Sequence, residues 1–220
     1  AEAEIEYEDH TSVTIYARFP VKQASHPALD GALIIIWTTT PWTMPGNRAV
    51  AYGNDISYQV VEVINPNEGS LCEKGDVLVM ADDLADDVIE AIGAGETALQ
   101  ASLMGCEMAG TITAHPMAGH GYDYDVPLLA GSHVTTEQGT GFVHIAPGHG
   151  VEDFELAHLE HGIAVPDTVS ENGQILAHLP IFGGMHVLRD NAKIADLMAI
   201  HKGVVGIGKL VHSYPHSWRS

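Results

Sequence analysis

The pattern of apolar and polar positions predicts a chain of short strands interrupted by three helices. Apolar and polar side chains alternate over 12–19, which is typical of a half-buried strand, and the apolar run at 32–37 predicts a strand buried on both faces. Further strands are expected at 48–52, 57–64, 76–80, 141–145 and 203–212. Helices are expected at 82–92, 151–161 and 190–202, ended by Gly93, Gly162 and Gly203.

The order of these elements favours an α+β fold over a regular strand–helix alternation. Strands arrive in clusters, and 97–134 carries a glycine or proline every few residues, as in hairpins and loops. We therefore expect a mixed, curved or barrel-like β-sheet core with a few peripheral helices. Without an internal repeat or a linker-like segment, residues 1–220 are expected to form a single domain.

The two ends of the chain suggest that it was excised from something larger. It begins Ala-Glu-Ala-Glu without an initiating Met, and it stops directly after a strand-like stretch. A whole domain more often tails off in polar residues, so we expect a fragment of a longer protein.

Composition narrows the classes of partner. Nine basic against 29 acidic side chains give a net charge of −20, which repels a phosphate backbone and disfavours a free-standing nucleic-acid binder. No apolar run approaches the roughly 20 residues of a membrane helix, so no membrane partner is expected. Cys72 and Cys106 form neither a disulfide framework nor a zinc motif, which suits a reduced chain in the cytoplasm.

The first candidate site is the threonine loop, residues 38–47, where the buried strand ends. Thr38, Thr39, Thr40 and Thr43 offer uncharged donors and acceptors suited to a ribose, an adenine edge or a positioned water. Two prolines and a glycine are expected to prevent any helix or ladder there. The alternative is that these threonines only fill strand positions.

The second candidate is the stretch 139–154. It combines a Gly-Thr-Gly entry, a short strand carrying His144, a Gly-His-Gly loop around His149, and a helix whose first turn holds Glu152 and Asp153. The helix dipole is expected to keep Asp153 ionised, which suits an anchor for a substrate ammonium better than a general acid. The alternatives are a capping aspartate, a core histidine and a loop histidine.

The 14 histidines of the chain raise the question of a metal site. His144 and His149 are five residues apart, as are His115 and His120, but no HxH, HExxH or His/Cys quartet appears. We therefore predict no metal. A metal-dependent hydrolase and a non-catalytic nucleotide-binding β domain stay open as alternatives.

Three stretches together, 37–47, 139–154 and His212-Ser-Tyr-Pro-His-Ser-Trp-Arg219, resemble the editing domain inserted in bacterial-type isoleucyl-tRNA synthetase. The resemblance covers essentially the whole chain in family order. Valyl and leucyl enzymes carry Thr-Thr-Arg-Pro in this loop, whereas Thr40 and Trp42 follow the isoleucyl pattern. Nothing resembles the ATP-binding signatures of the synthetase, so no aminoacylation is implied.

The resemblance implies hydrolytic editing: cleavage of the ester between valine and the 3′-terminal adenosine of isoleucine tRNA, with valyl-adenylate as a second substrate. It implies neither a metal, a cofactor nor a covalent nucleophile. The remainder of the synthetase would hold the tRNA body, so the acidic charge need not prevent contact with the single-stranded end. We therefore expect the chain alone to bind whole tRNA weakly.

The resemblance also assigns roles by position. Asp153 would hold the α-ammonium, and His144 would line the pocket and exclude the larger isoleucine side chain. His149, in the Gly-His-Gly loop, is a further candidate substrate-binding residue. Five residues would bind the terminal nucleotide and place the hydrolytic water: Thr38, Thr39, Thr40, Thr43 and Asn47. Of these, Thr38 and Thr39 would act in catalysis together with Asp153.

Overall fold

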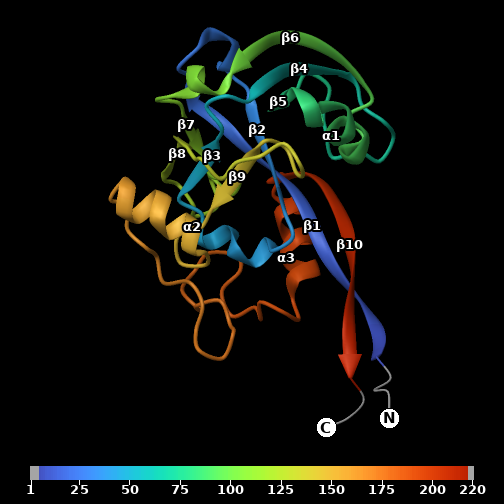
Figure 1. Cartoon of the computed structure of the whole chain (residues 1–220), viewed down its shortest axis with the longest axis vertical. Coiled ribbons are helices and arrows are strands. Elements are labelled where there is room, and N and C mark those ends of the chain that lie inside the picture. Colours follow the sequence, from blue (N-terminus) through green and yellow to red (C-terminus); the bar gives the residue numbers. More distant parts are fainter. Residues whose placement is uncertain (1–4, 218–220) are drawn as a thin grey trace.

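The computed structural model describes residues 5–217; Trp218 and Arg219 of the closing motif lie outside them. Ten strands form one open, mixed sheet in the order β6-β4-β5-β2-β1-β7-β8-β3-β9, and β10 pairs with β1 (Figure 1). The strands are β1 (Ile5–Gln23), β2 (Leu33–Thr38), β3 (Ala49–Tyr52), β4 (Ser57–Asn65), β5 (Val77–Ala81), β6 (Glu96–Met104), β7 (Ile112–Ala114), β8 (Asp125–Ala130), β9 (Phe142–Ile145) and β10 (Val204–Ser217). The α+β class with a mixed sheet is confirmed, and the sheet is curved rather than closed into a barrel.

Strand β1 is much longer than the predicted 12–19, and it shows how tertiary pairing extends a strand. It pairs antiparallel with β10 from Ile5↔Ser217 to Ala17↔Val204, with β2 from Ile15 to Pro20, and with β7 at Val21 and Gln23. Figure 1 shows the β1–β10 ribbon running away from the body toward both termini. Backbone pairing fixes this ribbon without needing apolar alternation along its whole length.

The core lies along β2, as its apolar run predicts. Residues 32–36 are all buried, and β2 pairs antiparallel with β1 and parallel with β5. The clearest predicted helix is present as a 3₁₀ turn, η3 (Asp82–Leu84), continued by α1 (Ala85–Ile92). Gly93 ends it at a φ of 67°, the left-handed conformation that favours glycine.

The other two helices differ from prediction in their last turns. Helix α2 (Val151–Phe154) continues as the π-helical segment η5 (Glu155–Glu160) and ends at Gly162, as expected. Helix α3 (Asn191–Ile200) is not ended by Gly203, because Lys202 takes the left-handed conformation at a φ of 60°. The backbone N–H of Gly203 then bonds the carbonyl of Met198 at 2.7 Å.

The expectation that no helix forms in the threonine loop is wrong. Pro41–Gly46 forms a 3₁₀ turn, η2. Proline at the first helical position removes only a donor that has no partner there, so Pro41 starts the turn instead of blocking it. The remaining short turns are η1 (Pro27–Leu29) and η4 (Gly105–Met108).

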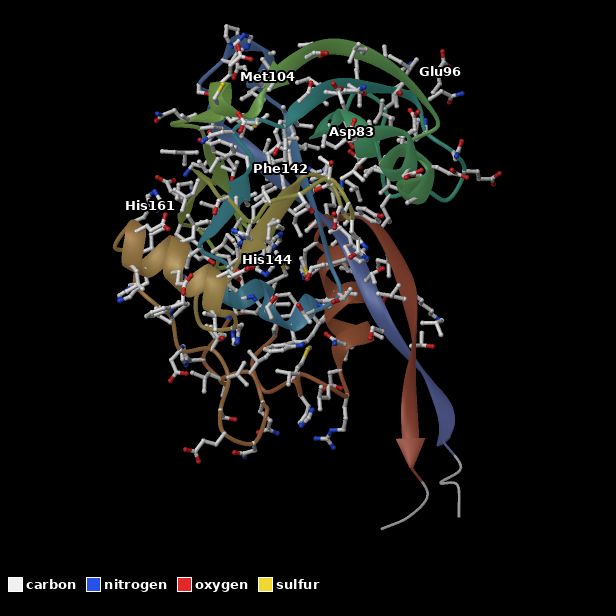
Figure 2. The ribbon with its side chains drawn as sticks, viewed as in Figure 1. Asp83, Glu96, Met104, Phe142, His144 and His161 are labelled. Carbon is white, nitrogen blue, oxygen red and sulfur yellow. The ribbon has the colours of Figure 1, made fainter. Side chains whose placement is uncertain are left out.

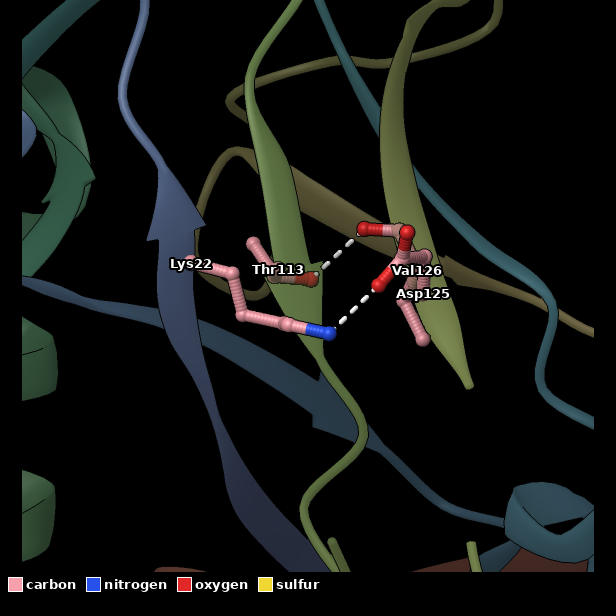
Figure 3. Close-up of polar contacts among 4 residues, drawn as sticks. All are labelled: Lys22, Thr113, Asp125 and Val126. Atoms are coloured by element: carbon pink, nitrogen blue, oxygen red, sulfur yellow. Dashed lines mark hydrogen bonds and ion pairs between the residues drawn. The ribbon is translucent and has the colours of Figure 1, made fainter. Parts of the chain in front are cut away.

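At the corner where β1, β7 and β8 meet, one polar contact is buried and one is exposed (Figure 3). Thr113 Oγ1 donates to the carbonyl of Val126 at 2.8 Å within the core. Lys22 Nζ lies 2.5 Å from Asp125 Oδ1, but both side chains are at least half exposed. Solvent screening leaves such a pair little net stability, so the buried contact contributes more; it adds to the backbone pairing of β7 with β8.

The strand register brings the two candidate stretches together. Strands β3 and β9 pair antiparallel with His144 opposite Val50, and the threonine loop leads directly into β3. Thr140, just before β9, donates from Oγ1 to the carbonyl of Ile35 in β2. Both cysteines are free, Cys72 buried and Cys106 exposed. Among the helices of residues 5–217, none has the length and apolarity to cross a membrane.

Candidate active site

The threonine loop presents three partly exposed threonines and buries a fourth. Thr38 Oγ1 accepts the backbone N–H of Thr40 at 3.1 Å and lies 3.2 Å from Thr40 Oγ1. Within the described part of the chain, the Thr39 hydroxyl has no hydrogen-bond partner. Thr43 is 6% exposed and donates from Oγ1 to the Thr40 carbonyl at 2.9 Å. The hydroxyls of Thr38, Thr39 and Thr40 are thus the ones that a ligand can reach.

His144 on β9 is held at both ring nitrogens. The Asn47 amino group donates to the Ala49 carbonyl at 3.0 Å and to His144 Nδ1 at 2.8 Å. Rotating the Asn47 amide by a half turn would place its oxygen next to the Ala49 carbonyl oxygen, where neither can donate. The amino group therefore faces both partners, and His144 Nδ1 is the acceptor. Nε2 therefore carries the proton and donates to Thr43 Oγ1 at 2.7 Å, because the Thr43 hydroxyl already donates its own proton to the Thr40 carbonyl.

This bonding keeps His144 neutral. Burial of the ring, together with smaller contributions from the nearby His115 and His149, lowers the pKa of His144 to about 3. Protonation at Nδ1 would oppose the Asn47 amino group, and neither nitrogen is left to ligate a metal or accept a proton. His144 as a whole residue is partly exposed, and Figure 2 places it between β9 and η2.

Two of the predicted binding residues turn inward. Asn47 is fully buried with both amide protons engaged, and Thr43 is nearly so, because each turns inward to His144. Both side chains thus face His144 in this structure, and their binding of a nucleotide stays a prediction. They lie behind the site and support the His144 ring.

Asp153 is the third residue of α2, and its carboxylate turns back toward the end of β9. Oδ2 accepts the backbone N–H of Ala146 at 2.9 Å. A Cβ on Gly150 would lie 3.3 Å from Asp153 Cγ, so glycine leaves room for this approach. Burial raises the pKa of Asp153, while the Ala146 bond and nearby His133 oppose the rise. Burial thus works against the ionisation that the helix dipole favours.

His149 links the loop after β9 to the threonine loop. Its backbone N–H bonds the Ala146 carbonyl at 2.9 Å, and its ring stands edge-on to Trp42 with centroids 5.0 Å apart. His149 Nε2 lies 3.0 Å from Thr168 Oγ1, and burial lowers the pKa of His149. The structure therefore brings both candidate stretches into one site.

The sequence does not point to every residue of this region. Thr168 lies in no motif, because the segment after η5 has no regular pattern of apolar and polar positions. The spacing of His115 and His120 suggests only a metal pair, yet His115 is fully buried against Met44, whereas His120 is exposed and contacts His201. Over residues 5–217, no three His, Cys, Asp or Glu side chains group as metal ligands.

A cavity of about 590 Å³ lies beside α2, but it is not this site. Glu152, Glu155, Glu160 and Asp55 line it together with His133. Thr38, His144 and Asp153 are not among its lining residues. The cavity and the hydrogen-bonded groups around His144 are therefore separate features of the molecule.

Comparison with known proteins supports the sequence resemblance. No family model matches the chain. Isoleucine–tRNA ligase of Gluconobacter oxydans is 43% identical over 233 residues, and that of Caulobacter vibrioides is 45% identical over 239. Each match covers 100% of this chain and 24% of the relative, so the chain spans about a quarter of their length.

Solved structures give the fold. GlLeuRS-CP1 superposes with a TM-score of 0.66 at 13% identity, covering 92% of this chain and all of the other. The editing domain of the P. falciparum cytosolic leucyl-tRNA synthetase gives 0.65 at 7% identity, covering 87% and 98%. The resemblance is thereby confirmed: the chain matches one segment of isoleucine–tRNA ligases along its whole length and has the fold of a synthetase editing domain.

Proposed function

We propose that this chain hydrolyses the ester that joins valine to the 3′-terminal adenosine of isoleucine tRNA, with valyl-adenylate as a second substrate. Its relatives are isoleucine–tRNA ligases, and one structural neighbour is an editing domain. The observation that carries the proposal is the neutral ring of His144, fixed between Asn47 and Thr43.

The need for a second pocket follows from the size of one methylene. A hydrophobic pocket discriminates isoleucine from valine by only about 1–3 kcal/mol, a magnitude established on isoleucyl-tRNA synthetase itself. A smaller hydrolytic pocket that admits valine and excludes isoleucine multiplies the discrimination. His144 is suited to form the wall of that pocket, because it can neither rotate freely nor take up a charge.

The remaining groups divide the work of hydrolysis. The Asp153 carboxylate holds the α-ammonium of valine, and the hydroxyls of Thr38, Thr39 and Thr40 bind the adenosine and position a water. The water oxygen attacks the carbonyl carbon of the ester, the bond from that carbon to the ribose oxygen breaks, and a proton of the water ends on the ribose oxygen, which leaves as a hydroxyl. Since both nitrogens of His144 are engaged, the water is activated by positioning and by a substrate hydroxyl.

The charge of the chain fits a division of labour within a larger cytoplasmic synthetase. Residues 1–220 act as a single domain that meets only the single-stranded end of the tRNA, while the rest of the enzyme holds the tRNA body. A net charge of −20 then does not oppose binding of the whole tRNA.

The ammonium anchor is tested by Asp153→Asn in a deacylation assay with valyl-tRNA(Ile). We expect hydrolysis to fall by about 10²-fold, because the amide keeps the shape and loses the charge. Glu152→Gln is the matched control, since it removes a neighbouring exposed charge from the same helical turn. Undiminished hydrolysis by Asp153→Asn would reject the anchor.

The wall is tested by His144→Ala with isoleucyl-tRNA(Ile). Removing the ring should let the chain hydrolyse this ester, which the wild type rejects. Continued rejection would show that His144 does not exclude isoleucine by its size.

Two alternatives have their own readouts. A metal-dependent hydrolase would lose activity on dialysis against a chelator and regain it with metal, whereas we expect full activity throughout. A non-catalytic nucleotide-binding domain would leave the half-life of valyl-tRNA(Ile) equal to that in buffer alone.

A further inference from the structure

The turn η2 is held from below by side chains of the β7–β8 connection, beginning with His115. This residue follows β7 and is fully buried. His115 Nδ1 accepts the backbone N–H of Met117 at 3.0 Å, so Nε2 carries the proton and donates to the Met44 carbonyl at 2.8 Å. The ring of Tyr122 stacks on the imidazole with centroids 4.9 Å apart.

A second pair of donors meets at the carbonyl of Asn47. Tyr124 donates its hydroxyl to that oxygen at 2.7 Å, and Arg48 Nη1 donates to it at 2.7 Å. Arg48 Nη1 also donates to the Tyr124 hydroxyl at 2.6 Å, and the guanidinium carbon lies 4.3 Å from the centre of the Tyr124 ring. Burial raises the pKa of Tyr124 to about 12, so its hydroxyl stays a donor.

These contacts fall on the segment that carries the partners of His144. Thr43 precedes Met44 in the chain, and the Asn47 residue whose carbonyl is held also supplies the amide on His144 Nδ1. A short 3₁₀ turn interrupted by proline has poor hydrogen bonds of its own, so external donors decide where its side chains lie.

We propose that Arg48 and His115 are positioning residues that set the place of the His144 ring through η2, and with it the discrimination between valyl and isoleucyl esters. The discrimination rests on the proposed function; the placement of the ring does not. Arg48 is partly exposed, so its replacement is less disruptive than that of buried His115.

The test uses Arg48→Met, which keeps much of the stem and removes the donors, and Arg48→Lys, which keeps the charge and loses the fork. The ratio of kcat/KM for valyl-tRNA(Ile) to that for isoleucyl-tRNA(Ile) should fall by about tenfold in Arg48→Met, through faster cleavage of the isoleucyl ester. Arg48→Lys should restore part of the ratio. Val88→Ala, a buried truncation in α1, is the control for lost stability and should keep the wild-type ratio.

A second measurement decides the matter without activity. The ¹⁵N shifts of the His144 ring report its tautomer and hydrogen bonds, and they should change in Arg48→Met and in the donor-retaining variant His115→Gln, but not in Val88→Ala. Unchanged ring shifts in both variants overturn the inference, whether or not the wild type edits. A wild type that cleaves neither ester, with shifted ring signals, refutes the proposed function and leaves the positioning role standing.

Discussion

The buried neutral histidines predict a loss of stability in mild acid. His144 and His115 have native pKa values of about 3 and about 4, against about 6.5 in an unfolded chain. The folded pKa is depressed in both, so the native state takes up no proton where the unfolded state does. Their contribution is complete above about pH 6.5 and is lost as the pH falls toward the folded values.

The magnitude follows from proton linkage. At about pH 5, protonation stabilises the unfolded state by about 2 kcal/mol for each histidine, or about 4 kcal/mol for the two. This is a large share of the roughly 5–15 kcal/mol that stabilises an ordinary domain. The raised pKa of Asp153 acts in the opposite direction, since its native carboxyl binds a proton more readily than the unfolded one.

Urea unfolding at about pH 7.5 and pH 5 measures the effect in wild type and His144→Gln. The variant should lose about 2 kcal/mol less over this interval, because one of the two titrating rings is gone. Taking the difference between proteins cancels Asp153 and the relief of acidic repulsion, which both share. His178→Gln, at an exposed histidine, should keep the wild-type difference. An equal loss in wild type and His144→Gln would refute the reasoning.

Three further outcomes are expected. Lys202→Gly should raise the free energy of unfolding by about 0.5–1 kcal/mol, because glycine adopts the left-handed conformation of Lys202 without strain. Lys202→Ala should leave it nearly unchanged, because alanine keeps the strain and the exposed pair of Lys202 with Glu73 contributes little. Thermal unfolding compares the two variants. Tyr58→Phe should cost about 2 kcal/mol in urea unfolding, because it strands the Gly141 carbonyl and Gly53 N–H that the hydroxyl bonds at 2.6 and 3.0 Å. Whole tRNA without an attached amino acid should bind the chain weakly in a filter-binding assay, with little dependence on salt. Tight, salt-sensitive binding would contradict this expectation.

The sequence predicted elements where periodicity and local chemistry agreed. The apolar run of β2 and the glycine after α1 are examples, because burial on both faces and a left-handed cap each leave a local mark. The full length of β1 could not be predicted, since it is decided by pairing with β10 at the far end of the chain. The left-handed residue after α3 is Lys202 and not Gly203, one position earlier than predicted. The residue types alone do not determine which of the two positions takes this conformation.

The sequence predicted which segments of the candidate site lie together, but not how their individual side chains are oriented. Motifs identified the threonine loop and the stretch around His144, but not that Asn47 and Thr43 face inward, because that depends on the register of β3 against β9. The support from His115 and Tyr124 left no motif either, since both lie in a turn-rich segment whose contacts are all long-range.

The bonding of His144 has an energetic scale that suits the proposed discrimination. Displacing the ring breaks two neutral hydrogen bonds, to Asn47 and Thr43, each worth about 0.5–1.5 kcal/mol net and more if a buried partner is left unsatisfied. The resistance of roughly 1–3 kcal/mol equals what one extra methylene gains in an apolar pocket. Isoleucine therefore gains nothing by pushing the ring aside, whereas an apolar side chain held only by packing would yield more easily. Rejection then depends on a rigid polar support behind the wall, which is why the residues beneath the threonine loop matter as much as those that face the substrate.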